Sequence, residues 1–157
     1  MRRRHVRLSH YVAARLPHLL VDPILIEQVL VNLMKNAAES IDMAERPASR
    51  RSVELRVLPR QLEGVGQVAE FVVTDSGKGL APEVMERLYE AFYSTKAEGM
   101  GIGLNLCRSI VESHQGRMQA ENLYNGSEIA GCRFSFWLPM AKAIEPAAAA
   151  YIPLAIK

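Results

Sequence analysis

The clearest hydrophobic pattern in the chain follows Asp22-Pro23, a pair that predicts a helix start with Asp22 as the N-cap and Pro23 at the first helical position. Apolar residues then recur at helical spacing, namely Ile26, Val29, Leu30, Leu33, Ala37 and Ile41. This spacing predicts a helix with one buried face that runs to about Met43 and ends before Pro47. The segment 44–52 is polar and aperiodic, which is typical of a loop.

Shorter apolar runs predict the strands. The turn residues Gly64-Val65-Gly66 separate two such runs and predict a hairpin, whose second strand ends at Asp75. The expected strands lie within 6–20 and at 53–58, 68–74, 117–122 and 133–138.

Two further helices are expected after the hairpin. Pro82 is placed to open a short helix that lasts to about Glu90. A longer helix is predicted from about Gly103 to Gln115, with Gly116 capping its end. Its apolar stripe consists of Leu104, Cys107, Val111 and His114.

Interspersed helices and strands with an antiparallel hairpin predict an α/β (α+β) two-layer sandwich, in which a mixed, mainly antiparallel sheet carries its helices on one face. The chain of 157 residues is 49% hydrophobic and 23% charged, a balance that fits one globular domain. We expect this domain to cover 1–140. The segment 141–157, with an alanine run between prolines, is expected to be a tail or linker.

Charge and cysteine usage narrow the setting. A net charge of +2 does not indicate a nucleic-acid partner, and Arg2-Arg3-Arg4 lacks interleaved aromatic residues, so we interpret it as a solvated tail. Cys107 and Cys132 cannot form a disulfide framework, which favours a cytoplasmic location. No apolar stretch approaches the ~20 residues needed to cross a bilayer, so no membrane contact is expected for this domain. A membrane-anchored parent protein remains compatible with the sequence.

The first helix carries candidate chemistry on its polar face. Asn32 and Asn36 are four residues apart and therefore share a face, with Lys35 and Glu39 beside them. A carboxamide oxygen suits Mg²⁺, and a lysine can neutralise phosphate charge. The alternative is an ordinary solvent-exposed face that happens to carry two asparagines.

A second candidate follows the buried strand, at Asp75-Ser76-Gly77-Lys78-Gly79. The carboxylate of Asp75 could accept a hydrogen bond from an exocyclic amine such as adenine N6. Gly77 and Gly79 permit positive φ and close approach of a ligand to the main chain. A plain surface turn would show the same residues.

A third candidate is the glycine-rich segment 99–104, which leads into the last predicted helix. Backbone amides at a helix N-terminus can cradle a phosphate. The segment is not a Walker motif, because Leu104-Asn105 follows the last glycine, and it lies too late in the chain for a dinucleotide-binding fold. A mobile surface loop is the alternative interpretation.

The order of these candidates resembles the catalytic domain of sensor histidine kinases, a Bergerat-type ATP-binding fold shared with gyrase-type and mismatch-repair ATPases. The Ser-Thr-Lys at 94–96 is most similar to nitrogen-regulation and oxygen-sensing kinases. The resemblance covers about 5–140, including a final strand at 131–139. Its motifs are 28–37 (QVLVNLMKNA) for the N box, 75–79 (DSGKG) for the first glycine box, 90–96 (EAFYSTK) for the F box and 99–104 (GMGIGL) for the second glycine box.

The resemblance implies binding of ATP and Mg²⁺, with Asn36 as the metal ligand and Asp75 on the adenine amine. Asn32 and Lys35 would line the phosphate side, together with Lys96 as a third catalytic residue. The other implied nucleotide contacts are Gly77, Gly79, Phe92, Thr95, Gly99, Gly101, Gly103 and Leu104. Cys132 departs from the family, which often has threonine there, so a polar contact at this position is in doubt.

The resemblance also implies a protein-histidine kinase whose ATP γ-phosphate goes to a histidine on dimerisation and phosphoacceptor helices, and indirectly to a response regulator. None of His5, His10, His18 and His114 has the expected sequence context, so we expect the acceptor helices to lie outside this sequence. The ATPases of this fold carry a glutamate as general base where this chain has Asn32. This difference favours a kinase, with an ATP-hydrolysing or purely partner-binding module as the alternatives.

Overall fold

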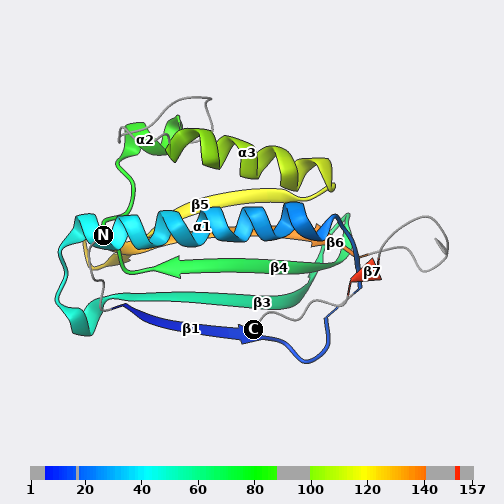
Figure 1. The fold of residues 1–157 in the computed structure, drawn as a ribbon, viewed down its shortest axis with the longest axis horizontal. Helices are drawn as coiled ribbons and strands as arrows, with labels where there is room; N and C mark the ends of the chain where they lie inside the picture. Colours follow the sequence, from blue (N-terminus) through cyan, green and yellow to red (C-terminus); the bar gives the residue numbers. More distant parts are fainter. Residues whose placement is uncertain (1–5, 17, 88–99, 141–150, 153–157) are drawn as a thin grey trace.

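The computed structural model describes residues 6–16, 18–87, 100–140 and 151–152. A five-stranded sheet in the order β1-β3-β4-β6-β5 carries the two long helices, α1 (Pro23–Ala44) and α3 (Met100–Ser113), on one face (Figure 1). β1 is parallel to β3, and all other neighbouring strands are antiparallel. This confirms the predicted two-layer sandwich. The strands are β1 (Arg7–Val12), β3 (Ser52–Leu62), β4 (Gly66–Asp75), β5 (Arg117–Asn125) and β6 (Glu128–Pro139).

α1 forms as its sequence predicts. The Asp22 carboxylate accepts hydrogen bonds from the amides of Ile24 (3.0 Å) and Leu25 (3.3 Å), which caps the first turn. The helix ends at Ala44, because Glu45 adopts a left-handed conformation with φ of 56°. Its buried face consists of Ile26, Val29, Leu33, Ala37 and Ile41.

β3 runs to Leu62, four residues beyond the predicted end, and it passes through Pro59. The carbonyl of Val57 accepts a hydrogen bond from Ala13, so residues of this parity direct their backbone groups toward β1. β1 pairs only as far as Val57. Pro59 has no N–H to donate, and its backbone faces the side of β3 on which β1 has already ended. No hydrogen bond between strands is lost, so the proline is tolerated.

Two boundaries near the later helices were predicted incorrectly. α2 (Pro82–Glu86) ends earlier than expected, and α3 begins at Met100 and not at Gly103. The left-handed residue after α3 is Gln115 (φ 69°) and not Gly116. Gly116 is required for a different reason, since a Cβ there would overlap the carbonyl oxygen of Trp137 on β6.

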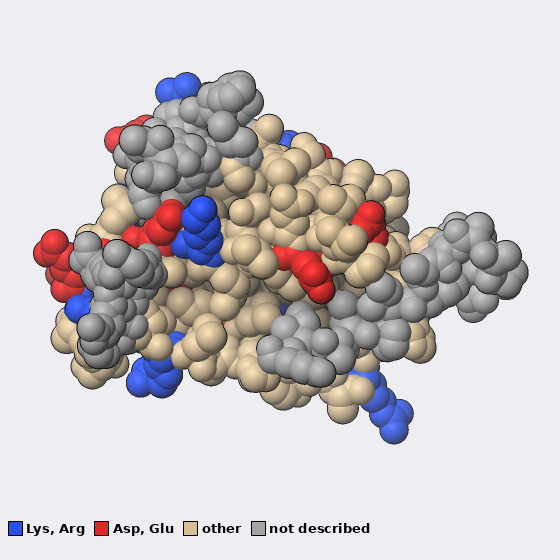
Figure 2. Space-filling model, viewed as in Figure 1, with Lys and Arg blue, Asp and Glu red and all other residues tan. Residues whose placement is uncertain are grey.

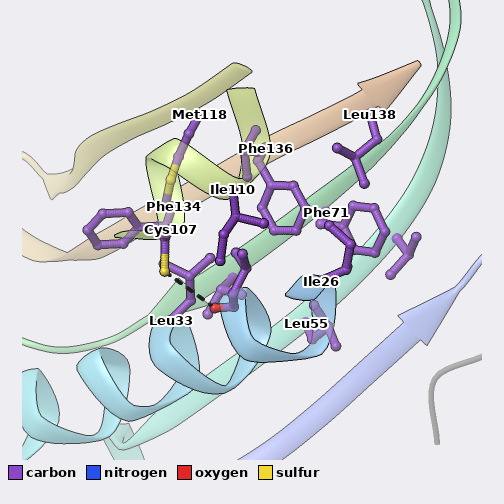
Figure 3. Packing of buried hydrophobic residues seen from close by; sticks show 14 of the residues in the cluster. Ile26, Leu33, Leu55, Phe71, Cys107, Ile110, Met118, Phe134, Phe136 and Leu138 are labelled. Carbon is purple, nitrogen blue, oxygen red and sulfur yellow. Dashed lines mark hydrogen bonds between the residues drawn. The ribbon is translucent and has the colours of Figure 1, made fainter. Parts of the chain in front are cut away.

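The hydrophobic core lies between the helices and the sheet (Figure 3). Phe71 of β4 and Phe136 of β6 stack at its centre, with ring centroids 4.6 Å apart. The two helices pack against each other as well as on the sheet, and the thiol of Cys107 on α3 lies 3.8 Å from the Val29 carbonyl of α1. The position of each helix is thus set by both the sheet and the other helix.

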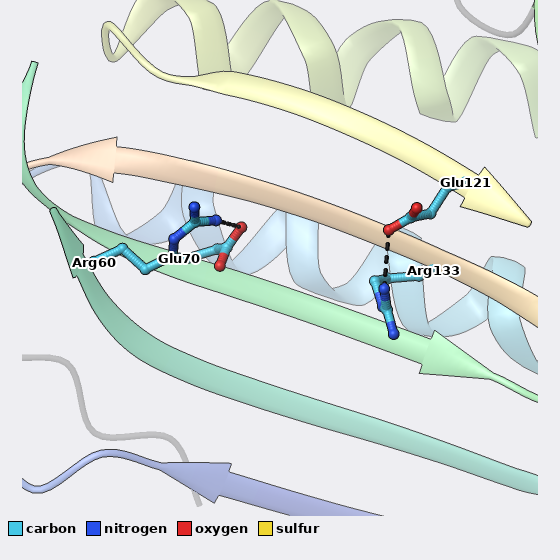
Figure 4. A network of polar contacts seen from close by, with 4 residues as sticks. All are labelled: Arg60, Glu70, Glu121 and Arg133. Carbon is cyan, nitrogen blue, oxygen red and sulfur yellow. Dashed lines mark hydrogen bonds and ion pairs between the residues drawn. The ribbon is translucent and has the colours of Figure 1, made fainter. Parts of the chain in front are cut away.

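The opposite face of the sheet carries ion pairs (Figure 4). Arg60 pairs with Glu70, and Arg133 pairs with Glu121, each at 2.9 Å. Such solvent-accessible pairs contribute at most about 1 kcal/mol each. On the side drawn in Figure 2, the charges of the described residues are interspersed and form no continuous basic patch.

Part of the predicted tail belongs to a second, small sheet. β2 (Leu19–Leu20) pairs with β7 (Tyr151–Ile152), and Leu19 also bridges to Met140. The rest of 141–157 lies outside the described residues, so the domain boundary at 140 stays a prediction. Among the helices that are described, none is both long and apolar enough to span a membrane.

Candidate functional site

Three polar or ionisable side chains form a row at one end of the sheet. Asp75 ends β4 and pairs with Cys132 of β6, which pairs in turn with Asn122 of β5. Strand residues two apart share a face, so Asp75 points to the same side as Phe71 and Val73, beneath the helices. At 5% exposure, Asp75 is the one charged residue that is buried among those described.

Burial raises the pKa of Asp75 from its ordinary value of 3.8 to about 6. Three favourable contacts act in the opposite direction: the amides of Gly77 and Cys132 and the charge of Arg46. The Gly77 amide donates to Oδ1 of Asp75 at 2.7 Å. At neutral pH the side chain is therefore a largely ionised carboxylate with one oxygen engaged by its own loop.

The raised pKa predicts that Asp75 makes the domain less stable as the pH rises. The folded state holds the Asp75 proton more tightly than the unfolded chain does. The stabilisation from this proton is therefore complete below pH 3.8 and is lost as the pH rises through about 6. The expected loss is on the order of 3 kcal/mol. Urea unfolding between about pH 4 and pH 8 should show this loss in the wild type and not in Asp75→Asn. Equal pH dependence in both proteins would contradict the assignment.

The loop after Asp75 packs directly on α1. A Cβ on Gly77 would lie 2.7 Å from both Cβ and the carbonyl carbon of Ser40. The next amide, of Lys78, donates to Oγ of Ser40 at 3.1 Å. Gly79 has the positive φ that its glycine permits, 74°, and an added Cβ would lie 2.5 Å from Cγ2 of Ile129. Gly77 thus permits the close approach of α1, and its predicted contact with a nucleotide stays a prediction.

Two residues distant in sequence hold the same loop. The side chain of Asn122 on β5 accepts from the Leu80 amide (2.8 Å) and donates to the Leu80 carbonyl (2.7 Å), as a neighbouring strand would. Arg46 donates to the carbonyls of Ser76 and Gly77. Neither Asn122 nor Arg46 was predicted from the sequence, and Ser40 was not predicted either. Ser40 could have been found, since it lies one turn after Asn36 on the same face, whereas no local pattern marks the other two.

Asn32, Asn36 and Ser40 form a polar stripe along α1 that extends about 12 Å. At one end, Asn32 contacts α3: an added Cβ on Gly103 would lie 3.9 Å from its carboxamide. Burial raises the pKa of the Cys107 thiol to about 11, and a hydrogen bond with Asn32 acts in the opposite direction. At the other end, Ser40 contacts the loop after Asp75.

Asn36, in the middle of the stripe, has an unsatisfied amide. Its Nδ2 is buried without a hydrogen-bond partner, and it is the one side-chain nitrogen or oxygen in this situation among the described residues. A buried amide without a partner is unfavourable by about 1–3 kcal/mol. Such a group is therefore a good candidate for contact with a ligand.

Of the predicted site, Asn32 and Asn36 lie on the polar stripe of α1, and the loop that carries Asp75, Gly77 and Gly79 contacts this stripe at Ser40. Lys35 is exposed on α1, and Leu104 is buried in the core at 2% exposure. Gly101 and Gly103 lie in the first turn of α3. Phe92, Thr95, Lys96 and Gly99 lie outside the described residues.

His114, one of the histidines considered as a phosphate acceptor, has a structural role. Its Nδ1 lies 2.8 Å from the Ile110 carbonyl, and its Nε2 accepts from the Asp22 amide at 3.1 Å. These contacts join the end of α3 to the start of α1 and require the neutral Nδ1–H tautomer.

Comparison with known sequences agrees with the resemblance to sensor histidine kinases. Residues 21–142 match the family described as histidine kinase-, DNA gyrase B-, and HSP90-like ATPase. The C4-dicarboxylate transport sensor protein DctS of Rhodobacter capsulatus is 38% identical over 146 residues, which cover 93% of this chain and 20% of the relative. The sensor protein FixL of Bradyrhizobium diazoefficiens is 38% identical over 122 residues, or 78% of this chain and 22% of the relative. The chain thus spans about a fifth of the length of these relatives.

Solved structures with the same fold include the catalytic domain of histidine kinase ThkA, with a TM-score of 0.64, 26% identity and coverage of 86% of this chain and 79% of that one. Full-length ShkA in complex with AMPPNP has a TM-score of 0.65 and 26% identity, covering 92% of this chain and 27% of that one. The chain belongs to the histidine kinase-, DNA gyrase B- and HSP90-like ATPase family and is the ATP-binding catalytic domain of a sensor histidine kinase.

Proposed function

We propose that the domain binds Mg-ATP between α1 and the loop after Asp75, and transfers the γ-phosphate to a histidine on separate dimerisation and phosphoacceptor helices of the same kinase. The observation that carries this proposal is the buried, unpaired amide of Asn36, which lies between the two ends of the polar stripe. The AMPPNP complex of the related ShkA supports the choice of ATP.

Asp75 would select adenine. Its carboxylate is acceptor-only when ionised, so it suits the N6 amine of adenine and disfavours O6 of guanine, which is also an acceptor. Oδ1 already accepts from the Gly77 amide. The other oxygen would therefore receive the adenine amine, and burial would strengthen this hydrogen bond.

Asn36 fits a magnesium site. Its orphaned Nδ2 and its Oδ1 are interchanged by turning the amide over, which would present the oxygen as a hard, neutral ligand. Mg²⁺ is usually held by one or two protein ligands, with phosphate oxygens and waters completing its shell. When bound, it would neutralise charge on the transferred phosphoryl group.

The phosphates would extend toward α3. The first turn of this helix contains Gly101 and Gly103, and the amides of a first helical turn together with the helix dipole favour an anion. Lys35 is exposed on the adjoining helix and would supply a positive charge. Phe92, Thr95, Lys96 and Gly99 are proposed to complete the contacts with the nucleotide.

Asn32 favours transfer over hydrolysis. A carboxamide cannot take a proton from water, so it cannot act as the general base that the ATPases of this fold use. The side chain of Asn32 forms a hydrogen bond with Cys107 of α3, which keeps it between α1 and α3. Phosphoryl transfer depends mainly on positioning and electrostatics, so the missing base is of little consequence for a kinase. A response regulator would receive the phosphoryl group afterwards, and we propose a cytoplasmic location for the domain.

We expect the isolated domain to bind Mg-ATP with micromolar affinity and to release almost no phosphate. Titration of a fluorescent ATP analogue should give a Kd at least about tenfold lower with Mg²⁺ than with EDTA. Asn36→Ala should lose this Mg²⁺ effect while it retains the weaker, metal-free binding. Absence of binding by the wild type would contradict the proposal, and brisk phosphate release would favour the hydrolase alternative.

A further inference from the structure

Arg46 joins three backbone carbonyls from two separate segments. Just after the left-handed end of α1, its Nε donates to Ser76 at 2.6 Å and its Nη2 donates to Gly77 at 2.9 Å and to Ile129 at 3.0 Å. The Arg46 carbonyl in turn accepts from Nε of Arg51 at 2.6 Å. Arg51 therefore anchors the backbone of Arg46, while the Arg46 guanidinium links the loop after β4 to the start of β6.

These carbonyls are close to the proposed base-binding carboxylate. Ser76 and Gly77 directly follow Asp75, and the Gly77 amide donates to Oδ1 of Asp75. On the other side, a Cβ on Gly131 of β6 would overlap the carbonyl oxygen of Asp75, so β6 lies against the same backbone. A residue that holds Gly77 to Ile129 therefore limits how far the carboxylate can move.

Arginine suits this position better than other residues. Its planar guanidinium presents several N–H donors in a fixed arrangement and stays charged at all relevant pH values. A lysine could supply the charge but not the same fixed geometry toward three carbonyls. The positive charge also lies near enough to Asp75 to oppose the rise of its pKa on burial.

We propose that Arg46 is a positioning residue for base recognition, which holds the backbone of Ser76 and Gly77 so that Asp75 faces the adenine amine. This inference rests on the proposed nucleotide-binding function. It assigns selectivity for the base to a residue outside all four sequence motifs of the site.

The test uses the domain with Arg46→Lys and Arg46→Gln and measures binding of Mg-ATP and Mg-GTP by calorimetry. Both variants should bind ATP about tenfold more weakly, and the ratio of the GTP and ATP Kd values should fall by a similar factor. Compared with Arg46→Gln, Arg46→Lys should regain less than half of the lost selectivity, because lysine supplies the charge without the fixed geometry. Amide hydrogen exchange at Gly77 should become about tenfold faster, with no change at Phe71 in the middle of β4.

Arg60→Lys and Arg60→Gln are matched controls, because Arg60 also donates a side-chain hydrogen bond, to Glu70, but lies on the opposite face of the sheet. They should leave both Kd values and Gly77 exchange unchanged. An equal loss of ATP and GTP affinity with unchanged Gly77 exchange would overturn the proposal, as would variants that match the wild type. Unfolding of both Arg46 variants would show a general structural role and would also overturn it.

The wild-type titration separates this inference from the proposed function. If the wild type does not bind ATP, the nucleotide function fails, while Gly77 exchange still reports whether Arg46 holds the loop. If the wild type binds ATP selectively and the Arg46 variants do so equally well, only the role of Arg46 fails.

Discussion

Replacing Asp75 by asparagine is expected to weaken Mg-ATP binding by about a hundredfold or more while the domain stays folded. Oδ1 of Asp75 accepts from the Gly77 amide, and an asparagine oxygen would be retained in this position. The amide nitrogen would then replace the other carboxylate oxygen and place a donor against the N6 amine of adenine. Isothermal titration calorimetry with ATP measures the effect directly.

Glu70→Gln is the matched control for Asp75→Asn. Glu70 also lies on β4, but it pairs with Arg60 on the opposite face of the sheet (Figure 4). The control should bind ATP as the wild type does. An Asp75→Asn domain with wild-type affinity would remove Asp75 from the proposed adenine site, whatever its effect on stability.

Replacing Gly77 by alanine is the second change with a large expected effect. The new Cβ would lie 2.7 Å from the carbonyl carbon and from Cβ of Ser40, so the loop must move away from α1. Overpacking of this kind destabilises a domain by about 1–3 kcal/mol. The displaced loop also carries the hydrogen bond from Gly77 to Asp75, so ATP affinity should fall at least about tenfold.

Urea unfolding and ATP titration of Gly77→Ala can be compared with Gly64→Ala. Gly64 has φ of 82° and no atom within 4 Å of an added Cβ, so its replacement should destabilise by about 1 kcal/mol through backbone strain alone. It should not affect ATP binding. Removing the Ser40 side chain should not rescue Gly77→Ala, since the overlap with the backbone carbon remains. Full rescue by Ser40→Gly would contradict this account.

The sequence by itself determined the features that depend on local chemistry. Asp22 and Pro23 specify the start of α1, because capping involves only the next few residues. The apolar spacing of α1 specifies which face of the helix is buried. It follows that Asn32 and Asn36 lie together on a different face of the helix. The position of Asp75 at the end of a buried strand follows equally from a local pattern, and the four ordered motifs identified the family.

Other features depend on which distant segments become neighbours. The extension of β3 through Pro59 is possible because β1 ends at Val57, which no pattern around the proline reveals. Gly116 resembles a helix cap in sequence, whereas the approach of β6 is what excludes a side chain there.

The environment of Asp75 was likewise decided only by the tertiary structure. Its sequence suggested a carboxylate beside flexible glycines. The folded chain adds Arg46 and Asn122, which lie 29 and 47 positions away and hold the loop through backbone hydrogen bonds. Burial, which raises the pKa of Asp75 to about 6, also results from packing by α1 and β6. The chemistry that a side chain can perform follows from its residue type, but its burial and its partners depend on contacts between segments far apart in the chain.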